Sequence, residues 1–388
     1  MIDIDEKAYC CALNRIFGFE PKVGLALING LGSAKEVFML DRKELEHILG
    51  PHSKHKDSIN LRKVEETAEE LDRLNRQGIT FIGYGEPDYP ELLKECDDPP
   101  VGLYVRSVSS HKEVFNTGTA LSIVGTRDIS PYGKEWCGRI VEGLAACRER
   151  PCIVSGLAIG TDINAHLAAL EAGLPTIAVM ATGPETVYPF RHRSIAERMA
   201  ATPGCALITD YPPGTAALPV NFLRRNRIIA GLSLATILIE SKVRGGGMMT
   251  ARLAHTYNRE VYVLPGRADD LRSQGCNILI REKTAEPITD LESFIQSIRL
   301  TPERELSRQG ISKENLDRLY NGRLPQDRIS QMSEILLSIR SERGIMLEDL
   351  ANRIKTDYRR TAELVGILES DGLIETDLLQ RCFIRQKR

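Results

Sequence analysis

Six short apolar runs, separated by helical patterns, constrain the fold of this chain more than any other sequence feature. The runs are LSIV (121–124), CIVS (152–155), TIAVM (176–180), ALIT (206–209), ATILIE (235–240) and VYVLP (261–265). Near-continuous apolar runs suit strands that are buried on both faces of a parallel sheet, with helices covering those faces through right-handed crossovers. We therefore predict an α/β fold with a Rossmann-like, doubly wound, mostly parallel sheet. Any ligand should lie beyond the carboxyl ends of its strands.

The residues before this sheet predict a smaller helical domain over 1–78, of a helix-hairpin-helix or SAM-like kind. Apolar residues recur at helical spacing from about 5 to 75, and Gly30 and Gly32 interrupt them. The Gly-x-Gly is either a hairpin that offers backbone N–H groups to a phosphate or a plain turn between packed helices. After it come short strands and turns, which we expect to form an irregular lead-in to an extended Rossmann-like domain over 79–300.

The C-terminal residues predict a polar linker over 301–328 and a winged-helix-like module over 329–388. Three helical patterns are followed by a possible short β-wing. Residues 301–388 contain 16 basic and 15 acidic residues. Because this charge is nearly balanced, the module is expected to contact a protein partner at least as readily as it binds DNA on its own.

The composition predicts a cytoplasmic protein with no metal site. The 51 Lys and Arg residues against 53 Asp and Glu leave a net charge of −2, so binding to nucleic acid requires a local basic patch. No apolar run reaches the roughly 18 residues that span a bilayer, and the acidic N-terminus does not resemble a signal peptide. Nine cysteines without paired CxxC motifs favour reduced, mostly buried thiols over disulfides or structural zinc.

The first two predicted strands run into glycine-containing loops that suit an anion. Val124 leads into Gly125 and then Arg127, whose planar guanidinium suits a phosphate. The second strand leads into Ser155, Gly156 and Gly160, just before a helix. The dinucleotide fingerprint GxGxxG is absent, which argues against an NAD enzyme and predicts no cofactor.

Asp162 and His166 lie four residues apart, on one face of the predicted second helix. The pair permits two interpretations. One is an acid/base pair; the other is a helix cap beside a structural histidine, which the lack of a visible nucleophile or metal partner favours.

Two further stretches predict contacts with nucleic acid. Residues 219–231 contain one aromatic residue and three arginines without an acid, which would let a base stack while phosphates are neutralised. The candidate residues there are Phe222, Arg224, Arg225, Asn226 and Arg227. After the fifth strand, three glycines open another helix, and Gly246, Gly247 and Thr250 are the candidates. We expect all these loops to meet at one sheet edge.

At these residues the sequence resembles the DNA-processing protein A (DprA/Smf) family. The resemblance covers about 80 to 282 and is carried by GTRDISPYG (125–133), SGLAIGTDINAH (155–166), VYP (187–189), FLRRNRIIAGLS (222–233), GGGMMTARLA (245–254), LPGR (264–267) and SQGCNILI (273–280).

The resemblance implies a non-enzymatic protein of natural transformation. Such a protein protects incoming single-stranded DNA, helps to load the RecA recombinase onto it, and forms a homodimer through the Rossmann-like domain. The resemblance also implies which residues contact DNA: Arg127, Gly156, Gly160, Phe222 with the Arg-Asn-Arg group at 225–227, and the last glycine turn with Gly246, Gly247 and Thr250. The alternative is a nucleotide-processing hydrolase on a similar fold, but no carboxylate stands among residues 248–252, after the glycines.

Overall fold

The computed structural model divides the chain into two compact units, residues 1–301 and 302–388. It describes residues 5–384 except for 117, 302–315, 317–319, 321–323, 343, 372 and 378–379. The predicted linker over 301–328 therefore lies mostly outside the described residues. Each unit is treated separately below.

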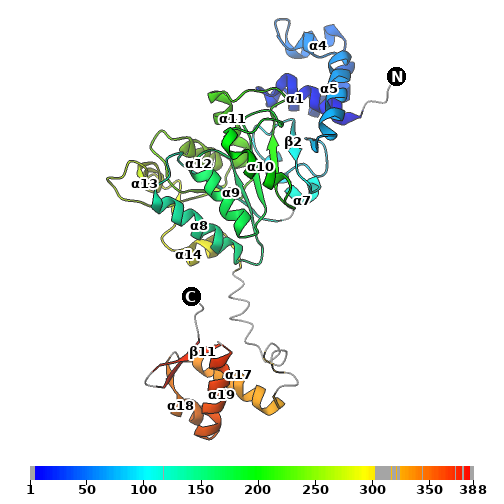
Figure 1. The fold of residues 1–388 in the computed structure, drawn as a ribbon. Coiled ribbons are helices and arrows are strands. Elements are labelled where there is room, and N and C mark those ends of the chain that lie inside the picture. Colours follow the sequence, from blue (N-terminus) through cyan, green and yellow to red (C-terminus); the bar gives the residue numbers. More distant parts are fainter. Residues whose placement is uncertain are drawn as a thin grey trace. The chain divides into compact units, whose positions relative to one another are not determined.

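The first unit is built on a nine-stranded sheet with the order β1-β2-β6-β5-β4-β3-β7-β8-β9 (Figure 1). Its strands are β1 (Ile79–Gly83), β2 (Gly102–Arg106), β3 (Ala120–Val124), β4 (Cys152–Ser155), β5 (Thr176–Val179), β6 (Ala206–Thr209), β7 (Ala235–Leu238), β8 (Glu260–Val263) and β9 (Glu286–Pro287). Strands β3 to β9 pair in parallel. The predicted α/β, Rossmann-like, mostly parallel sheet is confirmed.

The helices cover both faces of this sheet because successive residues of each strand point to opposite sides. In β3, Leu121 and Ile123 pack against α8 (Pro131–Ala145), α9 (Thr161–Glu171) and α14 (Leu291–Ser297). Val124 points to the other face, which α11 (Pro219–Gly231) and α12 (Gly246–Thr256) cover. The remaining helices of this domain are α6 (Glu91–Lys94), α7 (His111–Phe115), η2 (Phe190–His192), α10 (Arg193–Ala200) and α13 (Gln274–Arg281).

The stretch around 79–115 is more regular than the irregular lead-in that we expected. Strand β1 pairs antiparallel with β2, and β2 pairs antiparallel with β6, so both extend the main sheet. Their apolar residues also close the core of the N-terminal helices, where Phe81 and Tyr104 pack edge to face. These helices are α1 (Glu6–Phe17), α2 (Pro21–Leu31), α3 (Ala34–Met39), α4 (Arg42–Leu49), η1 (Lys56–Ser58) and α5 (Leu61–Asn75).

The glycines at the end of α2 lead into a plain turn before α3. Gly30 lies inside α2, and Gly32 ends that helix with a φ of 92°. The backbone N–H groups of Ala34 and Lys35 at the start of α3 both donate to the carboxylate of Glu6. Since a carboxylate of the chain already occupies these donors, the structure favours the turn between packed helices over a phosphate-binding hairpin.

The second unit contains the expected helices and a small antiparallel sheet. The helices are α17 (Gln326–Ser341), α18 (Leu347–Arg353) and α19 (Tyr358–Ser370). Strands β10 (Ile345–Met346), β11 (Ile374–Thr376) and β12 (Arg381–Ile384) pair in the order β10-β12-β11. The strands that follow α19 occupy the place of the predicted wing.

All nine cysteines are free and buried. Burial raises the pKa of Cys137 and Cys276 to about 12, so these thiols are protonated near neutral pH. Among the described helices, none combines the length and the apolar character that a membrane crossing requires.

We predict that Gly102→Ala destabilises the first unit by about 1–3 kcal/mol, because overpacking strains a close-packed core. A Cβ at Gly102 would lie 2.1 Å from the ring of Phe81 and 2.8 Å from the carbonyl oxygen of Ile82. The free energy of unfolding, measured by urea denaturation, gives the change.

The matched control is Gly138→Ala in the interior of α8, where a Cβ would meet no atom within 4 Å. This variant should gain about 0.4–1 kcal/mol, because alanine restricts the unfolded chain. Equal effects of the two substitutions would contradict the packing that the structure assigns to β1 and β2.

Candidate nucleic-acid interface

The order of the parallel strands reverses at β3, and this reversal brings the candidate loops together. Strand β3 lies between β4 and β7, and the strands that follow β4 and β7 extend the sheet in opposite directions. Loops that leave the carboxyl ends of β3 and β7 therefore meet on one edge, where α/β proteins bind ligands. Arg127 lies in the loop that follows β3 at this edge, and the glycine turn at 245–247 lies in the loop that follows β7.

Three glycine loops pack against one another at this edge. A Cβ at Gly125 would lie 2.4 Å from Oγ1 of Thr161, and one at Gly160 would lie 2.3 Å from the carbonyl oxygen of Thr126. A Cβ at Gly247 would approach the Cα of Gly125 to 3.1 Å. Only glycine permits these backbone approaches, so the loops after β3, β4 and β7 form one continuous surface.

Arg225 lies beneath this surface, closed off from solvent. It is 3% exposed, its Nη1 donates to the carbonyl oxygen of Val179 at 2.8 Å, and its guanidinium fills the space where Gly156 has no side chain. Burial lowers the pKa of Arg225, and the nearby carboxylate of Asp162 opposes this shift. Arg225 thus supports the loop after β4 from within, and this corrects the expectation that it faces a ligand as a free cation.

Arg227 is also buried, and its charge is neutralised. Its Nη2 lies 2.5 Å from a carboxylate oxygen of Asp210, and its Nη1 donates to the carbonyl oxygen of Asp98. Asn226 is buried as well, and its Nδ2 points to the carbonyl oxygen of Gly246 at 3.5 Å. The stretch 219–231 has no acid of its own, but Asp210 supplies one from the end of β6, which corrects the inference of uncompensated charge.

Arg127 and Phe222 remain accessible and are in contact. The guanidinium carbon of Arg127 lies 5.3 Å from the centre of the Phe222 ring. Tyr188, which is 50% exposed, packs its ring against Phe222 with the centroids 5.4 Å apart. No described carboxylate forms an ion pair with Arg127. An unneutralised cation and two partly exposed rings therefore share one surface.

The glycine turn before α12 adds an open helix end. Gly246 is exposed, a Cβ there would meet no atom within 4 Å, and no side chain caps the helix. Lys242 and Arg244 on the same turn are exposed, and neither forms an ion pair with a described carboxylate. Gly247 and Thr250 are buried. The first N–H groups of α12 and the two cations suit a phosphate.

The start of α8, by contrast, is closed by the chain itself. Glu240, buried just after β7, accepts hydrogen bonds from the backbone N–H of Ser130 at 2.8 Å and from its hydroxyl at 2.5 Å.

Ser155, at the end of β4, is also buried, and its hydroxyl donates to the carbonyl oxygen of Ile123 at 2.6 Å. Ser155 therefore stabilises the sheet, which corrects its expected place in the ligand surface.

Arg224 lies apart from the other arginines of α11. It is partly exposed, and it packs against the N-terminal helices through Gly18 and Phe19. The predicted site residues thus separate into an accessible group, an internal supporting group and this one residue. The accessible group is Arg127, Phe222, Gly246 and, in part, Gly125; the supporting group is Ser155, Gly156, Gly160, Arg225, Asn226, Arg227, Gly247 and Thr250.

Sequence reasoning missed Tyr188, Lys242 and Arg244 as members of this surface. Tyr188 lies more than thirty positions before Phe222, so nothing in its local pattern links the two rings. Lys242 and Arg244 flank the glycine turn, and two cations beside three glycines were a usable signal.

Asp162 and His166 do not form an acid/base pair. The hydroxyl of Thr176 donates to the carbonyl oxygen of Ile153 at 2.7 Å, so Nδ1 of His166, 2.7 Å from that hydroxyl oxygen, carries a proton and donates to it. Asp162 accepts from the backbone N–H of Ala158 at 3.3 Å. The structure therefore favours the structural histidine. The expected cap is wrong, because the N-cap of α9 is Gly160 and no side chain caps this helix.

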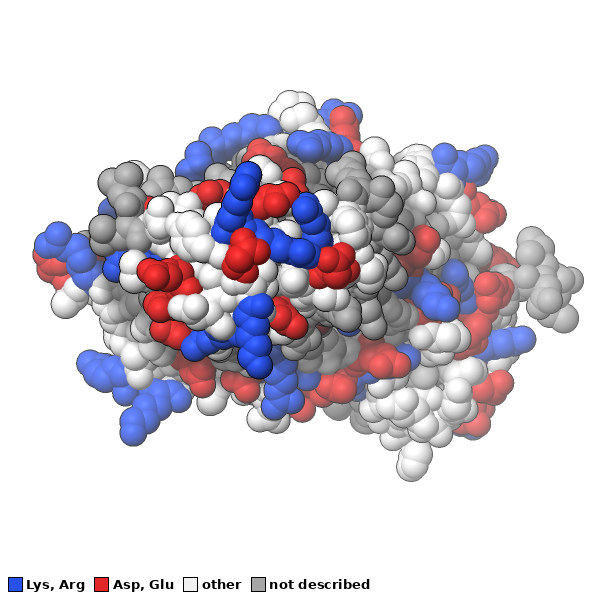
Figure 2. Space-filling view, turned by 90° about the horizontal axis from the view of Figure 1, so that it is seen from below, with Lys and Arg blue, Asp and Glu red and all other residues white. Residues whose placement is uncertain are grey.

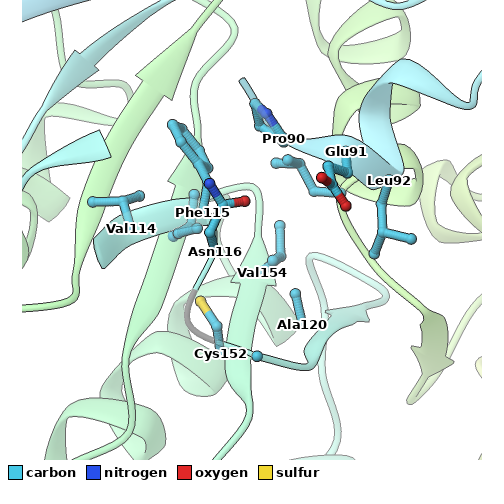
Figure 3. A pocket seen from close by; sticks show the side chains of 12 residues that line it. Pro90, Glu91, Leu92, Val114, Phe115, Asn116, Ala120, Cys152 and Val154 are labelled. Carbon is cyan, nitrogen blue, oxygen red and sulfur yellow. The ribbon is translucent and has the colours of Figure 1, made fainter. Parts of the chain in front are cut away.

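A cavity of about 340 Å³ lies at the opposite edge of the sheet (Figure 3). Leu92, Phe115 and Asn116 line it together with Ala120 and Cys152, which begin β3 and β4. Burial raises the pKa of the Cys152 thiol, which keeps it protonated. The cavity is separate from the loops that carry the candidate residues.

Four of the arginines that the structure describes in the second unit are neutralised. Arg328, Arg353, Arg360 and Arg381 each form an ion pair with a carboxylate of the same unit. Figure 2 shows Lys and Arg interspersed with Asp and Glu, without a wide area of one sign on the face drawn. A phosphate backbone would have to displace these carboxylates, which supports the expectation of a protein-contact module.

Comparison with known proteins finds one family model, described as DNA recombination-mediator protein A, that matches residues 80–299. The chain is 35% identical to protein Smf of Synechocystis over 60% of its own length and 57% of that protein. It is 34% identical to DNA processing protein DprA of Bacillus subtilis, over 59% of the chain and 74% of the relative. The Synechocystis match thus spans little more than half of that relative.

Two solved structures of similarly named proteins align with a large part of the chain. DNA processing protein A of Streptococcus pneumoniae aligns with a TM-score of 0.63 at 27% identity, over 74% of this chain and 95% of that one. The Helicobacter pylori protein, whose structure addresses its single-stranded-DNA binding mode, aligns with a TM-score of 0.50 at 28% identity. That alignment covers 57% of this chain and 95% of the other.

We predict that His166 makes the stability of the chain depend on pH below neutrality. Burial lowers the pKa of His166 to about 3, against an ordinary 6.5. Between these two pH values His166 is protonated in the unfolded chain but neutral in the folded chain. The free energy of unfolding therefore falls as the pH falls through this window. Between pH 7 and pH 5 the loss from this group is about 2 kcal/mol.

His166→Asn is the matched variant, because an amide can replace the bond to Thr176 without titrating. Urea denaturation should show a flatter pH dependence for this variant than for the unaltered chain. A slope that is identical in the two proteins would contradict the burial of a neutral His166.

Proposed function

We propose that this chain, which belongs to the DNA recombination-mediator protein A family, binds single-stranded DNA at the surface formed by Arg127, Phe222, Tyr188 and the glycine turn at 245–247. The observation that carries the proposal is the contact of the unpaired Arg127 with the accessible ring of Phe222 at the edge where α/β sheets bind ligands.

The chemistry of this surface suits an unpaired strand. A partly exposed aromatic ring stacks on a base only when that base is not already stacked within a duplex, and stacking tolerates any sequence. Arg127, Lys242 and Arg244 supply cations for the phosphates, and the first N–H groups of α12 supply donors. Rings and cations side by side are the combination found in proteins that bind single strands without base readout.

The alternative function, a nucleotide-processing hydrolase, finds less support. In Rossmann-like enzymes a phosphate sits at the start of the helix after the first parallel strand. Here the carboxylate of Glu240 accepts the donors of Ser130 at the start of α8. A bound phosphate would meet this charge. Both oxygens of Glu240 are also engaged, so it is poorly placed as an acid or base.

We further propose the partners that the family implies. The chain is expected to assist the RecA recombinase in coating single-stranded DNA during natural transformation, and to act as a homodimer through the Rossmann-like domain. The nine buried thiols suit a reducing cytoplasm. No catalytic step, metal or cofactor forms part of this proposal.

We predict that Arg127→Ala and Phe222→Ala each weaken binding to oligo-dT. Loss of the ring should remove about 1–3 kcal/mol of stacking, and loss of the cation should also reduce the dependence of affinity on salt. Fluorescence anisotropy across a range of NaCl concentrations measures both quantities.

Arg193→Ala is the control for the cation. Arg193 stacks near Phe190 but is already paired with Glu197 at 2.7 Å. Its removal should leave the affinity close to that of the unaltered chain. Unchanged binding by the double variant of Arg127 and Phe222 would place the DNA site elsewhere.

We also predict that the chain accelerates assembly of RecA on single-stranded DNA, and that the Arg127 and Phe222 variants do not. The rate of DNA-dependent ATP hydrolysis by RecA reports this assembly. The proposed homodimer is tested separately by sedimentation, which should give twice the mass of one chain. Acceleration by variants that no longer bind DNA would separate the RecA function from this site.

A further inference from the structure

The structure assigns a second stacking position for single-stranded DNA to the N-terminal helical region: we propose that the strand continues from Phe222 across the first turns of α11 to Phe19, which Arg224 holds in place. This inference rests on the proposed function and extends its site. It gives the N-terminal region a direct part in DNA binding.

Phe19 and Arg224 repeat the chemistry of Phe222 and Arg127. The guanidinium carbon of Arg224 lies 4.2 Å from the centre of the Phe19 ring, and its Nη2 donates to the carbonyl oxygen of Gly18 at 3.0 Å. Phe19 remains 58% exposed in spite of this contact. A large ring held at the surface by a cation is a ready platform for a base.

Charge distinguishes these two contacts from the other arginine–aromatic contacts of the described residues. Arg139 stacks on Trp136 but is paired with Glu135, and Arg193 lies near Phe190 but is paired with Glu197. Neither Arg127 nor Arg224 forms an ion pair with a described carboxylate. The carboxylate of Asp210 lies close enough to interact electrostatically with Arg224, but it is paired with Arg227.

The helix α11 links the two contacts by an exposed face. At about 100° per residue, Phe222 and Arg224 border an arc of about 200° that contains Pro219, Val220 and Leu223 in the first turns. These three residues are exposed, whereas Asn221 and Arg225 on the opposite side are buried. Further along the helix the same arc contains the buried Asn226 and Arg227, so the exposed face is confined to the first turns.

No side chain caps the start of α11. A DNA strand that follows this face therefore crosses an apolar surface and an uncapped helix start. It has Phe222 with Arg127 at one end and Phe19 with Arg224 at the other.

The N-terminal helices and the sheet hold these positions in a fixed relation. Nδ2 of Asn14, on α1, donates to the backbone carbonyl of Asp210 at 2.8 Å, and Tyr211 lies beside the Phe19 ring with a centroid separation of 6.3 Å. Residues 1–301 form one compact unit. Phe19 is thus presented beside α11 without any rearrangement of domains.

The test compares Phe19→Ala and Arg224→Gln with Arg139→Gln, a control in which the stacked arginine is already neutralised. Affinity is measured by anisotropy for oligo-dT of about 20 and of about 4 nucleotides. We expect the first two variants to lose about fivefold or more in affinity for the longer strand. They should bind the shorter strand like the unaltered chain, because it fills the Phe222 position alone, and the control should match the unaltered chain on both.

Photo-crosslinking gives a second measurement that does not depend on a substitution. A strand that carries 5-iodouracil is irradiated with the unaltered full-length chain, and the adducts are mapped by mass spectrometry. We expect adducts on the peptides that contain Phe19 and Phe222. Full affinity of both variants for the longer strand, with no adduct near Phe19 but one near Phe222, would overturn this inference alone. Binding that is independent of Arg127 and Phe222 would overturn the proposed function as well.

Discussion

The buried ion pair between Arg227 and Asp210 fixes the geometry on which the candidate site depends. Its charges lie 2.5 Å apart, and both side chains are almost wholly removed from water. Removing one partner of such a pair leaves an uncompensated buried charge, which costs about 3–5 kcal/mol. The same guanidinium binds the carbonyl oxygen of Asp98, and the backbone of Asp210 accepts a bond from Asn14. One helix is thereby tied to the end of β6, to the stretch before the parallel strands and to the N-terminal helices.

This anchoring explains why three consecutive polar residues of α11 are internal. Arg225, Asn226 and Arg227 bond to the end of β5, to the glycine turn at 245–247 and to Asp210. Val220 and Leu223, in the first turns of the helix, are exposed to solvent. The usual arrangement of a surface helix, with apolar residues inside and charged residues outside, is reversed at its first turns. Such a reversal is costly for stability alone, and an exposed apolar face beside unpaired cations is suited to a ligand with flat bases and phosphates.

The sheet was predictable from the sequence, whereas the roles of the site residues were predictable only in part. The apolar runs located six strands because burial on both faces leaves a continuous signal. The convergence of Gly125, Gly160 and Gly247 followed from topology, because parallel strands place their carboxyl ends on one edge. Burial of Arg227 was not predictable, because its partner Asp210 lies outside the local stretch and pairing depends on tertiary contacts. The ring of Tyr188 was missed for the same reason.

Carboxylates of the chain itself decide which of its helix starts remain open to an anion. Glu6 accepts the donors at the start of α3, and Glu240 accepts those of Ser130 before α8. Both starts would otherwise attract phosphate, since free N–H groups and the helix dipole favour negative charge. No side chain caps the starts of α11 and α12. Helix α11 carries Phe222, and α12 packs against it. The chain therefore closes the position that a nucleotide occupies in a Rossmann-like enzyme and leaves open the positions beside Phe222. A fold that is common among nucleotide-binding enzymes thereby becomes suited to the proposed contacts with the phosphates of a strand.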